Sequence, residues 1–282
     1  MKRAFVLFFS IAFPYLLFFC IPVYAFHAEV LPREINPGDV FLIKVSGTKT
    51  RAVPHACLNG KEFLFSGRAG HSFIAIGAAD IETKPGVYDI KLKAGKKKGK
   101  LKLQVRKAGF PETQLTLPDK KVFLKARDLA RVRKENKRLE RTFEKISRRL
   151  WEGDFIAPVN NEITTAFGTR RIMNGKWTSV HRGIDMRGHA GDEVHASNDG
   201  RVVLEEDLFF GGNTIVLDHG QGIYTVYMHL SEFRVKPGDV VAKGDTIGFV
   251  GSSGRATGPH LHFGAKVYEM SVNPVSLFKL KL

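Results

Sequence analysis

Hydrophobic and polar residues alternate in two stretches of the N-terminal half of the chain. Val87–Leu92 and Lys100–Arg106 both repeat with a period of two, the spacing of a strand with one buried face. Lys and Gly residues from 94 to 99 separate them, so the pattern predicts a hairpin with a loop at 94–99 and a strongly basic outer face. A further apolar run, Val40–Val45, follows turn residues. Several short strands in about 85 residues predict an Ig-like β-sandwich over residues 26–110.

The apolar period changes to that of a helix between residues 119 and 150. Apolar residues follow one another at spacings of 7, 3, 7, 4, 3 and 4: Val122, Leu129, Val132, Leu139, Phe143, Ile146 and Leu150. This seam predicts a basic amphipathic helix over 119–151 that links two domains. The same seam, with Asn136 at a core position, also fits a helix-mediated coiled-coil dimer. Because the seam covers only about four heptads, we favour packing of the helix on a neighbouring domain over a coiled-coil dimer.

Short strands return in residues 152–282, with turns at Gly211-Gly212, His219-Gly220 and Pro237-Gly238-Asp239. Their rhythm predicts a compact antiparallel β-domain. The fold class expected for the whole chain is therefore mainly β: an N-terminal sandwich, a linking helix and a C-terminal antiparallel β-domain.

Residues 1–25 have the pattern of a secretory signal peptide. Two basic residues precede the apolar run Phe5–Phe19, and Val23-Tyr24-Ala25 places small residues at the −3 and −1 positions of a cleavage site. The uncharged stretch Ala4–Phe26 is also long enough to serve as an uncleaved membrane anchor. Both alternatives predict export to the periplasm or cell envelope. Cleavage leaves Cys57 as the single cysteine, so no intramolecular disulfide is expected.

The net charge of +16 is unevenly distributed along the chain. Residues 91–107 hold nine Lys and Arg residues and no acid, residues 119–150 have a net charge of +8, and residues 152–282 have a net charge of −2. In an exported chain, anionic envelope polymers or the membrane surface are the expected partners of such basic segments, rather than nucleic acid. The alternative is a solvated basic face that aids solubility.

Histidine and aspartate recur at fixed spacings in the C-terminal domain. His181 and Asp185 belong to the string His181-Arg182-Gly183-Ile184-Asp185, and His260 and His262 stand two residues apart. On strands, each pair shares a face, and Gly183 leaves room for an ion. Two imidazoles and one carboxylate, with a fourth position for water, are typical of a catalytic zinc site. His229 is a fifth candidate, and the expected cofactor is one Zn²⁺ per chain.

These residues resemble the motifs of the lysostaphin-type (LytM-like) zinc endopeptidases. Three motifs match in the same order: His181-x-Gly183-x-Asp185, Tyr227-Met228-His229-Leu230 and Thr257-Gly258-Pro259-His260-Leu261-His262-Phe263. Supporting strings also match: Phe167-Gly168-Thr169-Arg170, Asn198-Asp199-Gly200-Arg201-Val202 and Asn273-Pro274. The resemblance covers about 155–278. It implies a zinc peptidase domain, placed here at 152–282, that hydrolyses peptide bonds in peptidoglycan.

By position, the resemblance implies that His181, Asp185 and His262 bind zinc and that His229 and His260 are catalytic. We prefer His260 as the general base because it shares a strand with a ligand.

Asn161, Arg170 and Tyr227 are candidate substrate-binding residues, although Tyr227 could equally pack in the core. Residues 171–180 depart from the form expected between the motifs, which leaves the shape of the substrate groove open.

Two other functions use the same scaffold. Some members of this group have lost ligands and activate other cell-wall hydrolases without catalysis, and a secreted zinc protease could act on Gly-rich proteins. The five intact chemical positions favour an active enzyme over an activator, but no residue separates the two substrate classes. A further hypothesis is that the β-domain or the helix covers the groove until it is displaced.

Overall fold

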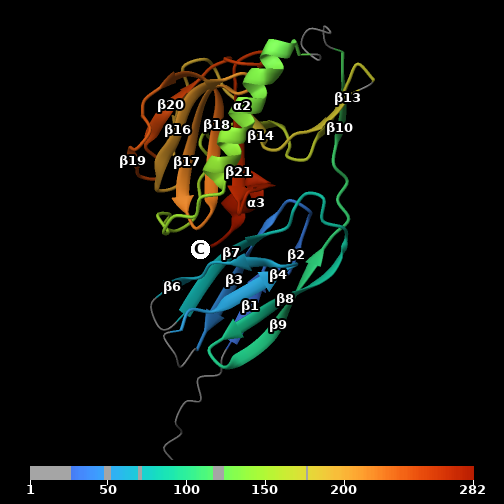
Figure 1. The fold of residues 1–282 in the computed structure, drawn as a ribbon, viewed down its shortest axis with the longest axis vertical. Coiled ribbons are helices and arrows are strands. Elements are labelled where there is room, and N and C mark those ends of the chain that lie inside the picture. The colour runs from blue at the N-terminus through green and yellow to red at the C-terminus, as the bar shows by residue number, and fades with distance from the viewer. Residues whose placement is uncertain (1–26, 48–51, 69–71, 117–123, 176) are drawn as a thin grey trace, which may run out of the picture.

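The computed structural model describes residues 27–47, 52–68, 72–116, 124–175 and 177–282 (Figure 1). Strands dominate these residues, which confirms the prediction of a mainly β fold. The predicted signal peptide lies outside the described residues. Neither of the helices in the described segments is long and apolar enough to span a bilayer.

Two sheets form the N-terminal half of the molecule. The first has the order β1-β3-β7-β6 and the second has the order β2-β9-β8-β4-β5. Phe41 from the first sheet meets Phe63 from the second edge to face, with ring centroids 5.5 Å apart, so the two sheets share one apolar core. The strand bounds are β1 His27–Leu31, β2 Glu34–Ile35, β3 Val40–Ser46, β4 His55–Leu58, β5 Lys61–Phe63, β6 Ser66–Arg68, β7 Ser72–Ala78, β8 Gly86–Ala94 and β9 Lys97–Val105.

The basic hairpin of β8 and β9 is longer than the sequence predicts. Lys93 pairs with Lys98 and Ala94 pairs with Lys97, so the predicted loop over 94–99 is wrong. A two-residue turn replaces it, and Gly95 supplies the positive φ, 59°, that such a turn requires. The Lys and Gly residues therefore extend the ladder instead of looping out, which lengthens the row of exposed lysines.

The linking helix α2, Ala126–Phe143, packs on the C-terminal sheet. Val132 and Phe143 are buried, and the Phe143 ring lies 5.4 Å from that of Tyr224. Part of the apolar seam thus packs within one chain, while Leu129 and Ile146 of the same seam are exposed. The helix ends well before the predicted residue 151 because the backbone beyond it bonds elsewhere: Gln221 N donates to Ser147 O and Leu150 N donates to His219 O.

The C-terminal half is built on one large antiparallel sheet with the order β11-β14-β21-β18-β17-β16-β19, to which β15, β20 and β22 attach. The bounds are β11 Ile163–Thr165, β14 Ile184–Arg187, β15 Glu193–His195, β16 Gly200–Leu208, β17 Gly212–Gly220, β18 Ile223–Phe233, β19 Val240–Val241, β20 Thr246–Val250, β21 His260–Val267 and β22 Met270–Val272. Helix α3, Pro274–Lys279, follows and begins at the N-cap Asn273.

A small second sheet joins the two halves of the chain. It consists of β10 Glu112–Leu115, β12 Arg170–Met173 and β13 Trp177–Val180. β10 comes from the segment before the helix and pairs in parallel with β12. The chain that leaves the sandwich therefore becomes the edge strand of the C-terminal half (Figure 1).

Direct contacts also tie the sandwich to the C-terminal half. Asn273 N donates to Gly38 O (2.7 Å), and its side-chain amide donates to Asp39 Oδ1 (2.9 Å). The Tyr268 hydroxyl accepts from Leu64 N at 2.8 Å. Apolar residues from both halves form one continuous core at this contact, so the sandwich supports the C-terminal sheet directly.

Candidate metal centre and active site

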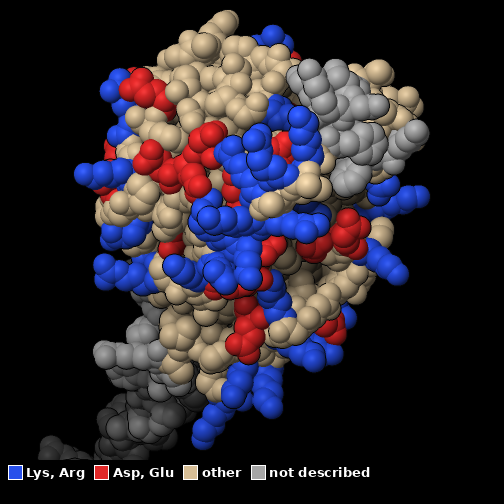
Figure 2. All heavy atoms as spheres, turned by 45° about the horizontal axis from the view of Figure 1, so that its top comes forward, with Lys and Arg blue, Asp and Glu red and all other residues tan. Residues whose placement is uncertain are grey.

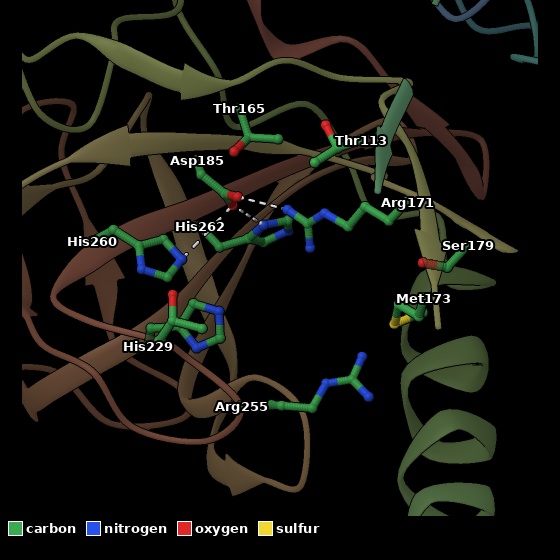
Figure 3. A pocket seen from close by; sticks show the side chains of 11 residues that line it. Thr113, Thr165, Arg171, Met173, Ser179, Asp185, His229, Arg255, His260 and His262 are labelled. Carbon is green, nitrogen blue, oxygen red and sulfur yellow. Dashed lines mark hydrogen bonds and ion pairs between the residues drawn. The ribbon is translucent and has the colours of Figure 1, made fainter. Parts of the chain in front are cut away.

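A pocket of about 300 Å³ opens where β14, β18 and β21 meet the small sheet. Figure 3 shows the side chains that line it. They are Thr113, Thr165, Arg171, Met173, Ser179, Asp185, His229, Arg255, Thr257, His260 and His262.

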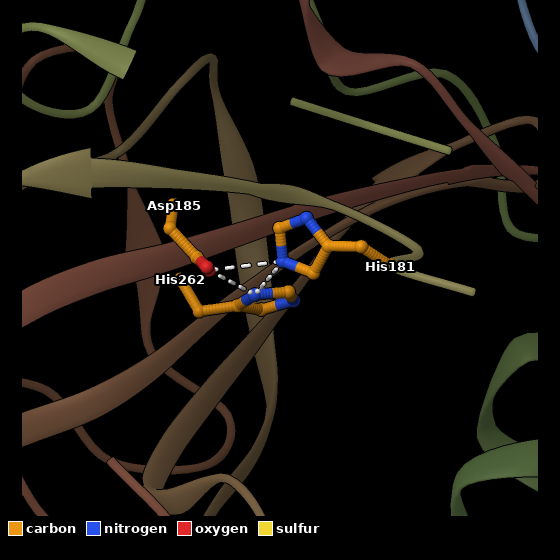
Figure 4. A group of neighbouring side chains, drawn as sticks. All are labelled: His181, Asp185 and His262. Carbon is orange, nitrogen blue, oxygen red and sulfur yellow. Dashed lines mark hydrogen bonds and ion pairs between the residues drawn. The ribbon is translucent and has the colours of Figure 1, made fainter. Parts of the chain in front are cut away.

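Three predicted metal ligands converge (Figure 4), and two of them, Asp185 and His262, line this pocket. Asp185 on β14 stands directly opposite His262 on β21, so strand register brings the two together. Asp185 Oδ1 lies 2.8 Å from His262 Nδ1 and 2.9 Å from His181 Nε2, and the two ring nitrogens are 3.0 Å apart. One ion can therefore be reached by all three side chains.

His181 reaches this cluster from a loop rather than from a strand. It lies between β13 and β14, so the expectation that residues 181 and 185 share a strand face is wrong. Two backbone contacts orient it: its N–H donates to Thr169 O (2.9 Å) and its Nδ1 bonds Ala166 O (3.0 Å). Gly183 leaves room for the His262 ring, since a Cβ there would stand 2.7 Å from His262 Nε2.

The chemistry of the three donors fits zinc. A carbonyl can only accept, so His181 Nδ1 carries a hydrogen and Nε2 is the nitrogen that faces the cluster. Burial raises the pKa of Asp185, but hydrogen bonds and charge from His181 and His262 outweigh it and hold this pKa well below its usual range. Arg171 Nη2 donates to the outer oxygen, Asp185 Oδ2 (2.8 Å), and leaves Oδ1 facing the two histidines. The site thus offers two imidazoles and an ionised, oriented carboxylate.

His229 and His260 face each other beside the ligand cluster, with ring centroids 4.8 Å apart. His229 Nδ1 bonds Ser253 O and His260 Nδ1 bonds Gly258 O, both at 2.9 Å. Both rings therefore carry hydrogen on Nδ1 and keep a lone pair on Nε2. Burial lowers the pKa of His229 to about 4, which keeps it neutral at pH 7.

The backbone at His229 is in an uncommon conformation. Its φ is +66°, in the left-handed region, within a stretch of β18 where the register with β17 shifts. Such strain costs free energy and persists where the surroundings hold it. Here His229 N donates to Gly211 O (2.7 Å), which helps to keep the ring turned toward the pocket.

The residues of this site lie in a segment that matches a known protein family. Residues 179–274 match peptidase family M23, and this range includes all five of the metal-site and catalytic candidates. The chain contains an M23 peptidase domain. The M23 match leaves the sandwich and the helix outside its range.

Two curated relatives each match about two fifths of the chain. The DD-carboxypeptidase/endopeptidase Mpg of Neisseria meningitidis is 40% identical over 119 residues, which are 42% of this chain and 27% of Mpg. The peptidoglycan DD-endopeptidase ShyA of Vibrio cholerae is 39% identical over 119 residues, 41% of this chain and 28% of ShyA. The chain thus spans little more than a quarter of the length of these relatives.

A solved structure matches far more of the chain. It is a Pseudomonas aeruginosa protein assigned to peptidase M23, with a TM-score of 0.66 and 28% identity over 86% of this chain and 93% of the other. Its likeness extends beyond the M23 domain into the N-terminal half.

The three candidate substrate residues lie away from the lining of the M23 pocket. The Asn161 amide donates to Arg187 O (3.0 Å), and Arg170 is exposed on β12. Tyr227 is fully buried, and its hydroxyl accepts from Ser197 N at 2.9 Å, so it packs in the core.

Other residues, which the sequence motifs did not indicate, also line the pocket. Arg171 is the neighbour of Arg170 on β12 and points to the opposite side, so strand alternation was the signal that could have found it. Arg255 lies in the loop after β20, and Thr113 lies in the segment before the helix. Neither stands in a pattern that indicates a pocket, because only the fold brings them there.

Proposed function

We propose that this chain is a zinc-dependent endopeptidase that hydrolyses peptide bonds of peptidoglycan in the cell envelope. The observation that carries the proposal is the convergence of His181, Asp185 and His262 beside two histidines whose Nε2 atoms bear lone pairs. The names of Mpg and ShyA support this choice of bond and substrate.

Zinc at such a site lowers the pKa of a bound water toward neutrality and polarises the scissile carbonyl. The chain's own residues handle the protons. We assign proton acceptance to His260, whose Nε2 lies 3.9 Å from Asp185 Oδ1, at the border of the ligand cluster. The neutral His229 would accept a hydrogen bond from the reacting water at Nε2.

Product analysis tests this proposal. We expect the mature chain to release new muropeptides from purified sacculi, and we expect a chelator or His229→Ala to abolish the release. Gly-rich peptide should be digested in parallel. Cleavage of that peptide alone would favour a secreted protease, and zinc binding without either activity would favour an activator.

We further propose that the basic segments 91–107 and 119–150 hold the enzyme to anionic envelope polymers or membrane headgroups. Figure 2 shows a band of Lys and Arg side chains in the region of α2. On that helix Arg138 pairs with Glu206 at 2.6 Å and thereby helps to hold the helix on the sheet. By contrast Arg133, Lys134 and Lys137 are exposed.

Salt-dependent sedimentation with sacculi tests this second proposal. Replacement of Arg133, Lys134 and Lys137 by Gln should weaken binding at about 50 mM salt and change it little at about 300 mM, since salt screens exposed charges. A matched control replaces three exposed cations of the M23 domain, Arg187, Arg234 and Lys236. Equal losses in both triple variants would contradict a specific role of the helix.

A further inference from the structure

The residues that line the pocket carry more positive than negative charge. Among the described residues that line it, Arg171 and Arg255 are the two guanidinium groups and Asp185 is the one carboxylate. Figure 3 shows Arg171 reaching Asp185 from one side of the open space and Arg255 extending from the other. A dication at the ligand cluster would raise the positive charge further, so the pocket as a whole favours an anion.

Arg255 is held in place by its surroundings. Its backbone N–H donates to the backbone carbonyl of Phe210 (3.0 Å), and its guanidinium carbon lies 4.3 Å from the centre of the Phe210 ring. Phe210 is in turn braced edge to face by Phe209 at 5.2 Å. Stacking uses the face of a guanidinium, while its five N–H donors lie in its plane, in the geometry that matches a carboxylate.

Backbone geometry also ties Arg255 to the catalytic residues. The loop after β20 contains Ser253, whose carbonyl accepts from His229, and it leads directly into His260. Gly254 in this loop has a φ of +68° and lies against Gly212, where a Cβ would stand 2.2 Å from Gly212 N. One close-packed loop therefore sets the positions of Arg255 and of both histidines.

The two arginines share one electrostatic environment. Burial, followed by the positive charge of Arg171, lowers the pKa of Arg255, although an arginine stays protonated at neutral pH. An anion between them would relieve this repulsion. Arg171 is bonded to Asp185 and is thereby turned toward the ligand cluster, whereas Arg255 extends from the other side of the pocket.

We propose that Arg255, opposite Arg171, forms a subsite for a free carboxylate of the peptide substrate, next to the bond that is cut. This inference rests on the proposed peptidase function and narrows its substrate class to acidic peptides. It disfavours Gly-rich chains, which carry no side-chain charge for such a subsite.

Matched substrates test the subsite. One cross-linked stem-peptide dimer is prepared as the free acid and, in parallel, with its carboxylates converted to carboxamides. We expect wild-type enzyme to cleave the free acid with a kcat/KM about 10- to 100-fold higher, the range for a charge-assisted hydrogen bond. Arg255→Gln should lose this preference, mainly through a higher KM, and Arg255→Lys should keep part of it.

Arg234→Gln is the control, because Arg234 also stacks on a phenylalanine, Phe249 at 4.8 Å, but lies outside the pocket lining. It should leave both rates unchanged. Equal loss on both dimers in Arg255→Gln, or no preference in the wild type, would overturn the subsite. Cleavage of neither dimer by zinc-loaded wild type would instead overturn the peptidase function on which the subsite rests.

Discussion

Two regions of the same sheet each anchor a histidine through Nδ1, and they differ in the partner of the other ring nitrogen, Nε2. At the pocket, His229 bonds Ser253 O through Nδ1, and its ring lies 4.8 Å from that of His260. Away from the pocket, the fully buried His219 bonds Asp199 O through Nδ1 (2.8 Å), but its Nε2 is hydrogen-bonded to Thr225 Oγ1 (2.7 Å). Anchoring through Nδ1 is therefore common to both histidines, and the partner of Nε2 distinguishes the catalytic histidine from the structural one.

The largest expected effect is on kcat, which should fall when His229 is replaced but not when His219 is replaced. His229→Ala should lower kcat about 10²- to 10⁴-fold, because the hydrogen-bond acceptor for the reacting water is lost, while zinc stays bound at one ion per chain. His219→Gln should leave kcat within about threefold at pH 7.5 in folded protein, because His219 lies outside the catalytic groups. Hydrolysis assays with metal analysis of both variants check this. An equal loss of kcat in folded His219→Gln would break the distinction.

The next effect concerns stability and pH. Burial lowers the pKa of His219 to about 4 from the ordinary 6.5, so this residue takes up its proton more readily in the unfolded chain. Its contribution is fully present above pH 6.5 and is lost as pH falls toward 4, by roughly 3 kcal/mol. Urea unfolding of the wild type should show this decline, and His219→Gln should show a flatter profile. Parallel profiles would contradict it.

A smaller effect is expected at the outer side of the ligand cluster. Arg171→Gln removes the donor to Asp185 Oδ2 and should weaken zinc binding about 10- to 100-fold, as loss of a ligand's orienting partner does. Competition with a chelating dye measures this affinity. Arg170→Gln, on the other side of the same strand, is the matched control and should change it little. If both variants bind zinc like the wild type, Arg171 does not orient the carboxylate.

Helix α2 shows where sequence patterns stop being informative. The heptad seam predicted its amphipathic face, and Val132 and Phe143 are indeed buried. The same seam continues to Leu150, yet the helix ends at Phe143 because the following backbone bonds to the turn after β17. A local pattern records which face is apolar, but it does not record competing backbone partners from elsewhere in the chain.

The candidate site was likewise predictable from the sequence only in part. The sequence by itself determined the donor types and their grouping, since His181 and Asp185, like His260 and His262, are neighbours within short motifs. Only the tertiary structure decided that Asp185 faces His262, that Arg171 rather than Arg170 enters the pocket, and that Tyr227 is buried. The physical reason is that strand register, burial and the carbonyls that orient each imidazole come from segments distant in the chain. Those contacts form only when the sheet does.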